Sequence, residues 1–265
     1  MEEKMKYITA IILGIIAIAS LASAGIIMTT QLQDLKNAKA QPMNQSTYLE
    51  KDLIRMDMKA DKSDMSMIFR GDKELFWMVD HKKKSYTEMT KEDLEKIQKM
   101  AEDAMKTMQE AMKNLPQGMQ NKMQGIMPGT EKKSEIIYKK VASGEKVNQW
   151  VTDKYEGTRD GKKEMDAWTT DWKKLGLKPE DLTGFEQMGN FFSSMMKNMS
   201  WYYKVGNDEK ATGMYFGFPV KTVSYDKEKP ASQYEIKEIK QEELNPTVFE
   251  APQGYKKEKF EMNKE

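Results

Sequence analysis

The sequence predicts an α+β fold: a curved antiparallel sheet, or half-barrel, with helices packed in or over its concave face. Two observations lead to this prediction. Many short runs alternate apolar and polar residues and are joined by tight turns, which is typical of antiparallel hairpins. Two longer segments instead repeat apolar residues at steps of three and four, the period of an amphipathic helix. Because the strands come in groups, a βαβ fold is not favoured.

The first 24 residues have the pattern of a signal peptide. Lys4 and Lys6 precede the apolar run Ile8–Leu21, and Ala22-Ser23-Ala24 is a small-x-small cleavage pattern. The alternative is a retained anchor in the cytoplasmic membrane at residues 7–28, because that run reaches the roughly 20 residues that span a bilayer. In both cases we expect an exported protein of the periplasm or cell envelope. A single half-barrel binding domain is expected at residues 25–255, followed by a flexible tail at residues 256–265.

The composition narrows the classes of function. Charged residues make up 32% of the chain and hydrophobic residues 38%, which fits a folded chain and not a disordered one. The net charge of +1 provides no basic field, so no nucleic-acid partner is expected. The absence of cysteine excludes disulfides, thiol catalysis and cysteine–metal sites.

The first half of the body is predicted to consist of strands. Gly25–Gln31 is expected to be a strand and the polar stretch Asp34–Thr47 a loop. Ile54, Met56, Met58 and Ala60 alternate with charged residues, which predicts a half-buried strand. Further strands are expected, after short turns, at Met65–Phe69, Leu75–Val79 and Ser85–Met89.

A helix with one apolar face is predicted from Thr90 to Pro116. Thr90 is a suitable N-cap, with Asp93 three residues later. Pro116 ends the helix, and a second, short helix is expected up to Met127. The apolar stripe of the first helix consists of Leu94, Ile97, Ala101, Met105, Met108, Met112 and Leu115.

The second half repeats the scheme. A longer helix is expected from Pro179 to Met199, with Leu182, Phe185, Met188 and Phe192 on its apolar face. Pro246–Phe249 is expected to be extended. Strands are expected at Ser134–Ala142, Asn148–Arg159, Glu164–Thr169, Trp201–Val205, Gly213–Tyr225 and Gln233–Lys240.

Several short phrases, in order, resemble an exported bacterial domain-of-unknown-function family. They include Ile54-Arg55-Met56-Asp57, Leu75–Asp80, Trp150-Val151, Gly217–Val220 and Phe249–Tyr255. That family is similar to the periplasmic carriers of outer-membrane lipoproteins, whose fold is a half-open antiparallel barrel closed by helices. The resemblance implies an apolar cavity between sheet and helices, but it does not identify the ligand.

The leading hypothesis is therefore a non-enzymatic binding protein for an apolar ligand: a lipid, an acyl chain or a lipidated protein. We expect a monomer that contacts a membrane surface and needs no cofactor or metal. The residues expected to line the apolar cavity or its lid are Phe69, Trp77, Met105, Met108, Met112, Trp150, Phe192, Met195 and Phe216.

Two alternatives stay open: a methionine-based copper(I)-binding protein and a structural envelope protein without a ligand. Thioethers suit copper(I), and the helices carry Met105, Met108 and Met112, then Met119, Met123 and Met127, then Met195, Met196 and Met199. We expect no tight copper(I) site, because the methionines are spread along whole helix faces and are not gathered with a histidine or carboxylate. The single histidine, His81, is expected to be a solvated turn residue, and no G-x-S-x-G, P-loop or dinucleotide motif indicates an enzyme.

Overall fold

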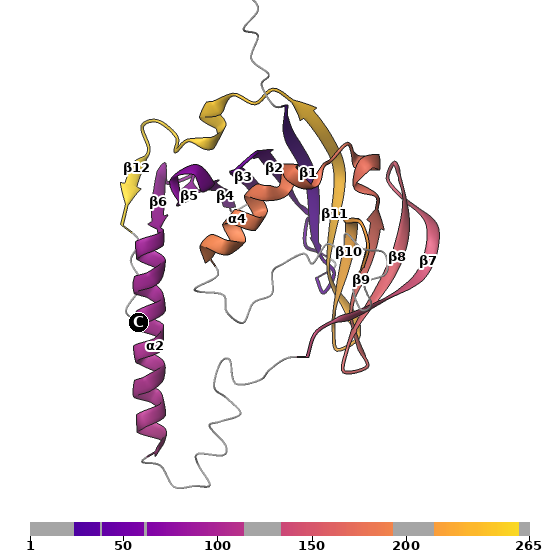
Figure 1. Ribbon diagram of the computed structural model, residues 1–265, viewed down its shortest axis with the longest axis horizontal. Coiled ribbons are helices and arrows are strands. Elements are labelled where there is room, and N and C mark those ends of the chain that lie inside the picture. Colours follow the sequence, from indigo (N-terminus) through magenta and orange to yellow (C-terminus); the bar gives the residue numbers. More distant parts are fainter. Residues whose placement is uncertain (1–23, 38, 61–62, 114–133, 193–214, 260–265) are drawn as a thin grey trace, which may run out of the picture.

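The computed structural model describes residues 24–37, 39–60, 63–113, 134–192 and 215–259. In these residues one open sheet of 12 strands runs through the whole body, in the order β12-β6-β5-β4-β3-β2-β1-β11-β10-β9-β8-β7. Figure 1 shows that this sheet is strongly curved. The strands are β1 (Gly25–Asp34), β2 (Met43–Glu50), β3 (Leu53–Ala60), β4 (Ser63–Arg70), β5 (Leu75–Asp80), β6 (Ser85–Thr90), β7 (Ile137–Val147), β8 (Trp150–Arg159), β9 (Lys162–Thr170), β10 (Phe218–Asp226), β11 (Lys229–Glu242) and β12 (Lys256–Glu258).

The curved sheet confirms that part of the predicted fold class, with one correction. The sheet is mixed, because β12 pairs in parallel with β6, whereas every other neighbouring pair is antiparallel. The prediction that Lys256–Glu258 belong to a flexible tail was wrong. They form a strand because they pair with β6, about 170 positions earlier in the chain. The residues around Lys256 contain no sequence pattern that indicates this distant partner.

A row of directly paired residues forms the centre of the core. Ile26 faces Leu49, Leu49 faces Ile54, and the row continues over Phe69 and Phe76 to Met89. All six side chains are buried in one cluster. Directly paired residues share one face of a sheet, so this row fixes which face of β1–β6 is apolar.

The opposite face of the same strands is covered by the end of the chain. Leu244 and Phe249 are buried against Ile68, Trp77 and Val79. We call residues 244–258 the C-terminal strap. It contains the 3₁₀ turn η4 (Pro246–Phe249), which Asn245 caps by accepting from the Thr247 amide.

Polar contacts tie this strap to the strands below it. The Arg55 side chain donates to the Val248 carbonyl at 3.0 Å. The Arg70 guanidinium forms a two-bond contact with Asp72, at 2.8 and 2.7 Å, and also pairs with Glu250. The Asp72 pKa lies below its usual range, chiefly because of the hydrogen bonds from Arg70.

The described residues contain two α-helices. The first, α2 (Lys91–Lys113), begins at the predicted cap: the Asp93 amide donates to Thr90 Oγ1 at 3.2 Å, and the Thr90 amide donates back to the Asp93 carboxylate at 3.0 Å. Leu94 and Ile97 are buried in the main core cluster. The apolar stripe then leaves the core, since Met105 and Met108 are 47% and 38% exposed.

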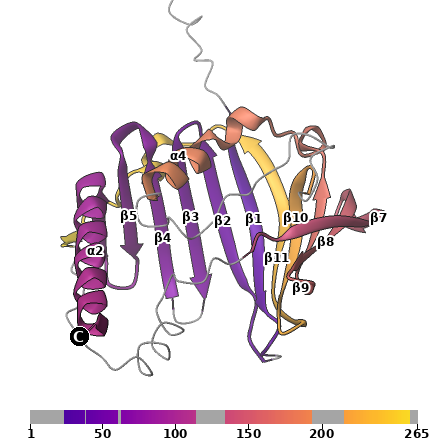
Figure 2. The same cartoon turned by 60° about the horizontal axis from the view of Figure 1, so that its bottom comes forward.

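The second helix is α4 (Thr183–Phe192), which follows the 3₁₀ turns η2 (Trp172–Leu175) and η3 (Pro179–Leu182). It lies across the strands, close to their ends on one side of the sheet (Figure 2). The Phe191 ring lies 5.5 Å from that of Phe69, and the Phe192 ring lies 5.0 Å from that of Phe76. The helix approaches the sheet closely at Gly184, where a Cβ would lie 3.0 Å from the Lys51 carbonyl oxygen.

Three further element predictions were wrong. The stretch predicted as a loop, Asp34–Thr47, contains the start of β2, whose polar residues are held between β1 and β3. Pro246–Phe249 is a 3₁₀ turn and not extended. The strand predicted to end at Ala142 continues to Val147, with a break in register at Ser143-Gly144, and the chain turns at Asn148.

Some predictions fall outside the described residues: the signal segment up to residue 23, the short helix before Met127, the strand Trp201–Val205 and the end of the tail. Among the described helices, none combines the length and apolar character of a membrane span.

Candidate functional site

A group of methionines lies on the apolar face of the sheet, beside the buried core row. Met56 on β3 pairs directly with Met67 on β4, which pairs directly with Met78 on β5. In the next row Met58 pairs with Met65. We call these five residues the methionine face. Because they alternate with Arg55, Asp57, Ser66, Ile68 and Trp77 along their strands, they share the face of Ile54, Phe69 and Phe76.

The methionine face is only partly covered. Met78 is 37% exposed, and the other four methionines are half-buried. Met56 and Met67 pack against the main core cluster, and so do Phe191 and Phe192 of α4. The arrangement therefore offers adaptable apolar side chains next to a wall of aromatic rings.

Three of the predicted cavity residues belong to this same core region. Phe69 and Trp150 are buried in the main cluster, and Phe192 packs against it. Met112 is buried as well, at 9% exposure.

The other predicted residues lie elsewhere. Trp77 is on the opposite face, under the C-terminal strap, where its indole donates to Glu88 at 2.9 Å. Phe216 packs against a separate cluster around Tyr155 and Tyr215. Met105 and Met108 are exposed on α2, and Met195 lies outside the described residues. The predicted set therefore combined residues from two faces of the sheet.

His81 is not the solvated turn residue that the sequence predicts. It is half-buried, with Nε2 at 2.6 Å from Ser66 Oγ and Nδ1 at 3.0 Å from the Tyr255 hydroxyl. Ser66 donates its proton to Asp57 at 2.5 Å, so a neutral His81 carries its proton on Nε2 and accepts from Tyr255. Ser66 is fully buried and bonded on all sides, so this cluster holds the C-terminal strap and provides no nucleophile.

A second polar cluster lies on β8–β10 around the buried carboxylate of Asp166. Lys163 and Lys154 lie 2.9 and 3.7 Å from it, and the Tyr225 hydroxyl donates to it at 2.8 Å. Burial alone would lower the Lys163 pKa, but the bonds to Asp166 and Glu156 raise it overall. These charges compensate one another, so the cluster acts as a structural network.

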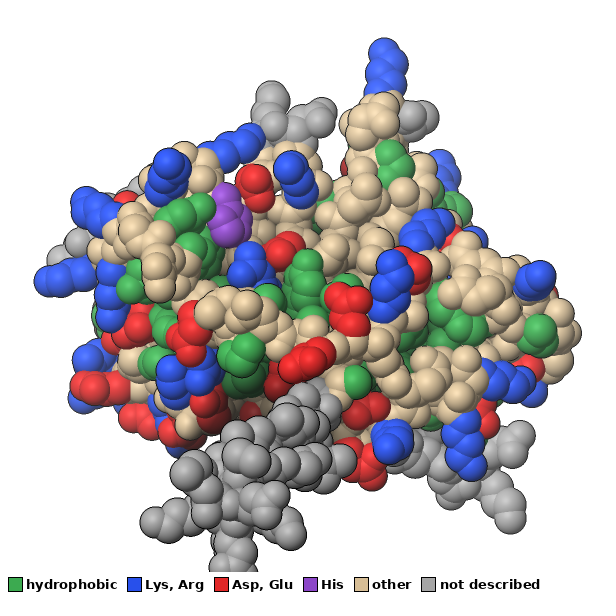
Figure 3. Space-filling view, turned by 90° about the horizontal axis from the view of Figure 1, so that it is seen from above, with side chains coloured by type: hydrophobic (Ala, Val, Ile, Leu, Met, Phe, Trp, Pro, Cys, Tyr) green, Lys and Arg blue, Asp and Glu red, His purple; other side chains and the backbone are tan. Residues whose placement is uncertain are grey.

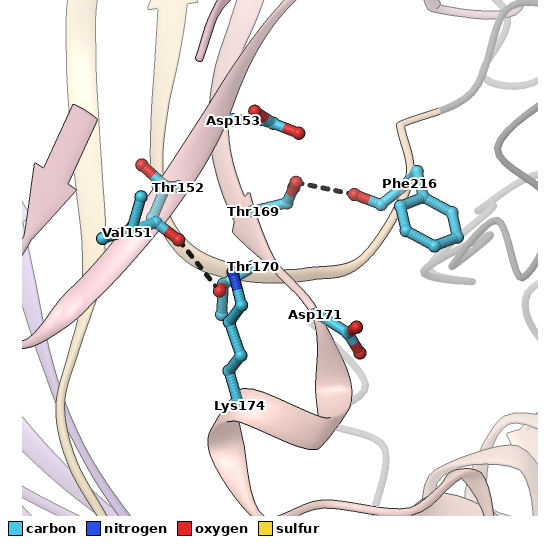
Figure 4. A pocket seen from close by; sticks show the side chains of 8 residues that line it. All are labelled: Val151, Thr152, Asp153, Thr169, Thr170, Asp171, Lys174 and Phe216. Atoms are coloured by element: carbon cyan, nitrogen blue, oxygen red, sulfur yellow. Dashed lines mark hydrogen bonds between the residues drawn. The ribbon is translucent and has the colours of Figure 1, made fainter. Parts of the chain in front are cut away.

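A small pocket of about 140 Å³ opens between β8, β9 and η2 (Figure 4). Its hydroxyl groups already have partners: Thr169 donates to the Phe216 carbonyl at 2.6 Å and Thr170 to the Val151 carbonyl at 3.0 Å. Asp153 pairs with Lys140 at 2.7 Å. The pocket therefore offers few unused polar groups to a ligand. It is lined by Val151, Thr152, Asp153, Thr169, Thr170, Asp171, Lys174 and Phe216.

Charge gives no further indication of a site. On the face seen in Figure 3, basic and acidic side chains are interspersed, with small apolar groups between them. Within the described parts of the chain, no three His, Asp or Glu side chains gather as a metal site would require.

Comparisons with known proteins leave the family open. No family model matches the chain, and no curated protein matches it. Among solved structures, an uncharacterized conserved protein from Thermus thermophilus is 9% identical with a TM-score of 0.46, over 90% of this chain and 91% of that one. PNGF-II in its C2 crystal form is 10% identical with a TM-score of 0.37, over 90% of this chain and 31% of that one. TM-scores below 0.5 do not establish a common fold.

Proposed function

We propose that this protein is an exported, envelope-facing binding protein that shelters an apolar ligand on the methionine face. In this proposal the curved sheet is a half-barrel, and α4 lies in its concave side as one wall of the binding region. The ligand is a lipid, an acyl chain or the lipid group of a modified protein. The proposal includes no enzymatic activity, and it takes the compartment from the signal-like pattern of residues 1–24.

The observation that supports the proposal is the methionine face itself. Each methionine has three rotatable bonds and a polarizable sulfur, so a group of them adapts to ligands of varied shape. The neighbouring Phe191 and Phe192 rings add a rigid apolar border. Burial of one methylene group contributes about 0.8 kcal/mol, so ten methylene groups contribute about 8 kcal/mol before the ligand's loss of freedom is subtracted.

Two measurements test the proposal. Mass spectrometry of the protein purified from the producing cell should detect co-purified lipid. A fluorescent fatty acid should bind the full chain, and binding should weaken at least about tenfold, or 1.4 kcal/mol, when Met58, Met65 and Met78 are all changed to Gln. The matched control changes Met100, Met105 and Met108 to Gln, because these exposed side chains lie on α2 and away from the sheet.

The control variant should bind the probe as the unchanged protein does. If instead the α2 variant loses binding and the sheet variant retains it, the helix is the ligand site and the methionine face is not. If neither lipid nor probe binds, the carrier function is wrong.

A further inference from the structure

We propose that the methionine face also binds a soft monovalent metal ion, copper(I), through the thioether sulfurs of Met56, Met67 and Met78. This inference does not depend on the proposed function. Copper(I) would be bound through the lone pairs of the thioether sulfurs, whereas an apolar ligand would be bound by burial of its surface.

The register of the sheet brings these three side chains together. Met67 is paired directly with Met56 on one side and with Met78 on the other, so the three lie in one row across β3, β4 and β5. Directly paired residues of adjacent strands have Cβ atoms about 4.5–5.5 Å apart. With three rotatable bonds each, the outer two side chains can turn their sulfurs toward that of Met67.

The site is accessible and has further sulfurs close by. Met78 is 37% exposed, and Met56 and Met67 are half-buried. Met58 and Met65 form the adjacent row on the same face, so either can replace one of the three as a ligand. The sequence predicts methionines spread along helix faces, whereas the register of the sheet places three of them side by side on neighbouring strands.

The type of ligand selects the metal. Thioethers are soft, neutral donors that favour copper(I) over zinc, magnesium or calcium. The only carboxylate in these two rows on β3–β5 is that of Asp80, which is paired with Met65. The Lys83 amide donates to it at 2.9 Å, and the Asp80 pKa lies below its usual range chiefly because of that bond. The Lys83 ammonium lies 3.4 Å from the Asp80 carboxylate and offsets its charge, so the proposed site rests on the thioethers.

The choice of residue also differs from that of the adjacent row. The buried row on the same strands uses Ile54, Phe69 and Phe76, residue types that suit strands. The three directly paired methionines differ from these residue types in carrying a thioether sulfur, which a soft metal ion can use as a ligand.

The experiment is an anaerobic titration of the full chain with copper(I) against a chromogenic chelator. We expect one equivalent to be captured with a dissociation constant below about 1 μM. Changing Met56, Met67 and Met78 together to Leu should weaken capture at least about 100-fold, equivalent to about 2.8 kcal/mol. Leu conserves the volume and apolar character of Met, so the variant should fold, which circular dichroism checks. X-ray absorption of the loaded protein should show sulfur neighbours.

The matched control changes Met100, Met105 and Met108 on α2 to Leu and should leave copper(I) capture unchanged. Equal weakening in both variants, or capture that survives the sheet variant, would overturn the assignment to the methionine face. A chain that captures no copper(I) would refute the metal site itself. The sheet Leu variant should still bind the fluorescent fatty acid, so failure of the metal site and failure of the lipid proposal give different results.

Discussion

Phe249 provides the strongest test of how the C-terminal strap stabilises the sheet. Its side chain is fully buried against Ile68, Trp77 and Val79, although it lies more than 160 residues after them in the chain. Replacing Phe249 with Ala removes the ring and leaves a cavity between the strap and the sheet. Truncations of this kind in a core destabilise proteins by about 3–5 kcal/mol.

That loss is a large part of the total stability of a typical domain, which is about 5–15 kcal/mol. In a protein of this size each kcal/mol lowers the melting temperature by about 2–4 °C, so a decrease of about 6–20 °C is expected. Urea unfolding followed by tryptophan fluorescence is a suitable assay, because Trp77 belongs to the same cluster.

Val151→Ala is the control, because Val151 is also on a strand but is 53% exposed. Its free energy of unfolding should change by less than about 0.5 kcal/mol. A Phe249→Ala variant within about 1 kcal/mol of the unchanged protein would show that the strap does not form part of the folded core.

Three further outcomes are expected. The hydrogen bonds from Lys257 and Trp77 hold the Glu88 pKa below the ordinary glutamate value of 4.5, so the stability that Glu88 adds is complete above that pH and is lost as the pH falls through the folded-state pKa. Urea unfolding of Glu88→Gln and of the unchanged protein should therefore differ at neutral pH and converge in acid; a constant difference would contradict this. Tyr255→Phe removes the bond to His81 and should destabilise by about 0.5–1.5 kcal/mol, with faster amide exchange in β12; unchanged exchange would mean that the bond does not hold the strap. Met108→Asp should change the unfolding free energy by less than about 0.5 kcal/mol because Met108 is 38% exposed; a loss of several kcal/mol in thermal or urea unfolding would place it in a dry core.

The parts of the fold that sequence predicted best are those with local signals. The alternation around Met56 and Met67 located β3 and β4 to within one or two residues, and the Thr90 cap located the start of α2. In contrast, β2 begins with Met43-Asn44-Gln45, whose polarity resembles a loop. It is a strand because it has a partner on each side, and pairing between segments leaves no trace in composition.

The candidate site shows the same limit. In the sequence, the methionines of β3 and β4 indicate only an alternating strand pattern. The predicted lid residues came instead from the longer apolar stripe of the helix after Thr90. Which strands are neighbours, and which residue faces which, depends on register. Without it, Phe69 and Trp77 could be grouped as one site although they lie on opposite faces.

Among the strands that the structure describes, β7 is an outer edge of the open sheet and has β8 as its one partner. An unpaired edge can recruit strands from other molecules and so promote aggregation. Here the edge is irregular, since the register of β7 shifts twice, between Lys140 and Ala142 and between Ser143 and Glu145. It also carries Lys139, Lys140 and Lys146. Bulges and lysines of this kind make a strand a poor template, so β7 can stay exposed without recruiting further strands at high protein concentration.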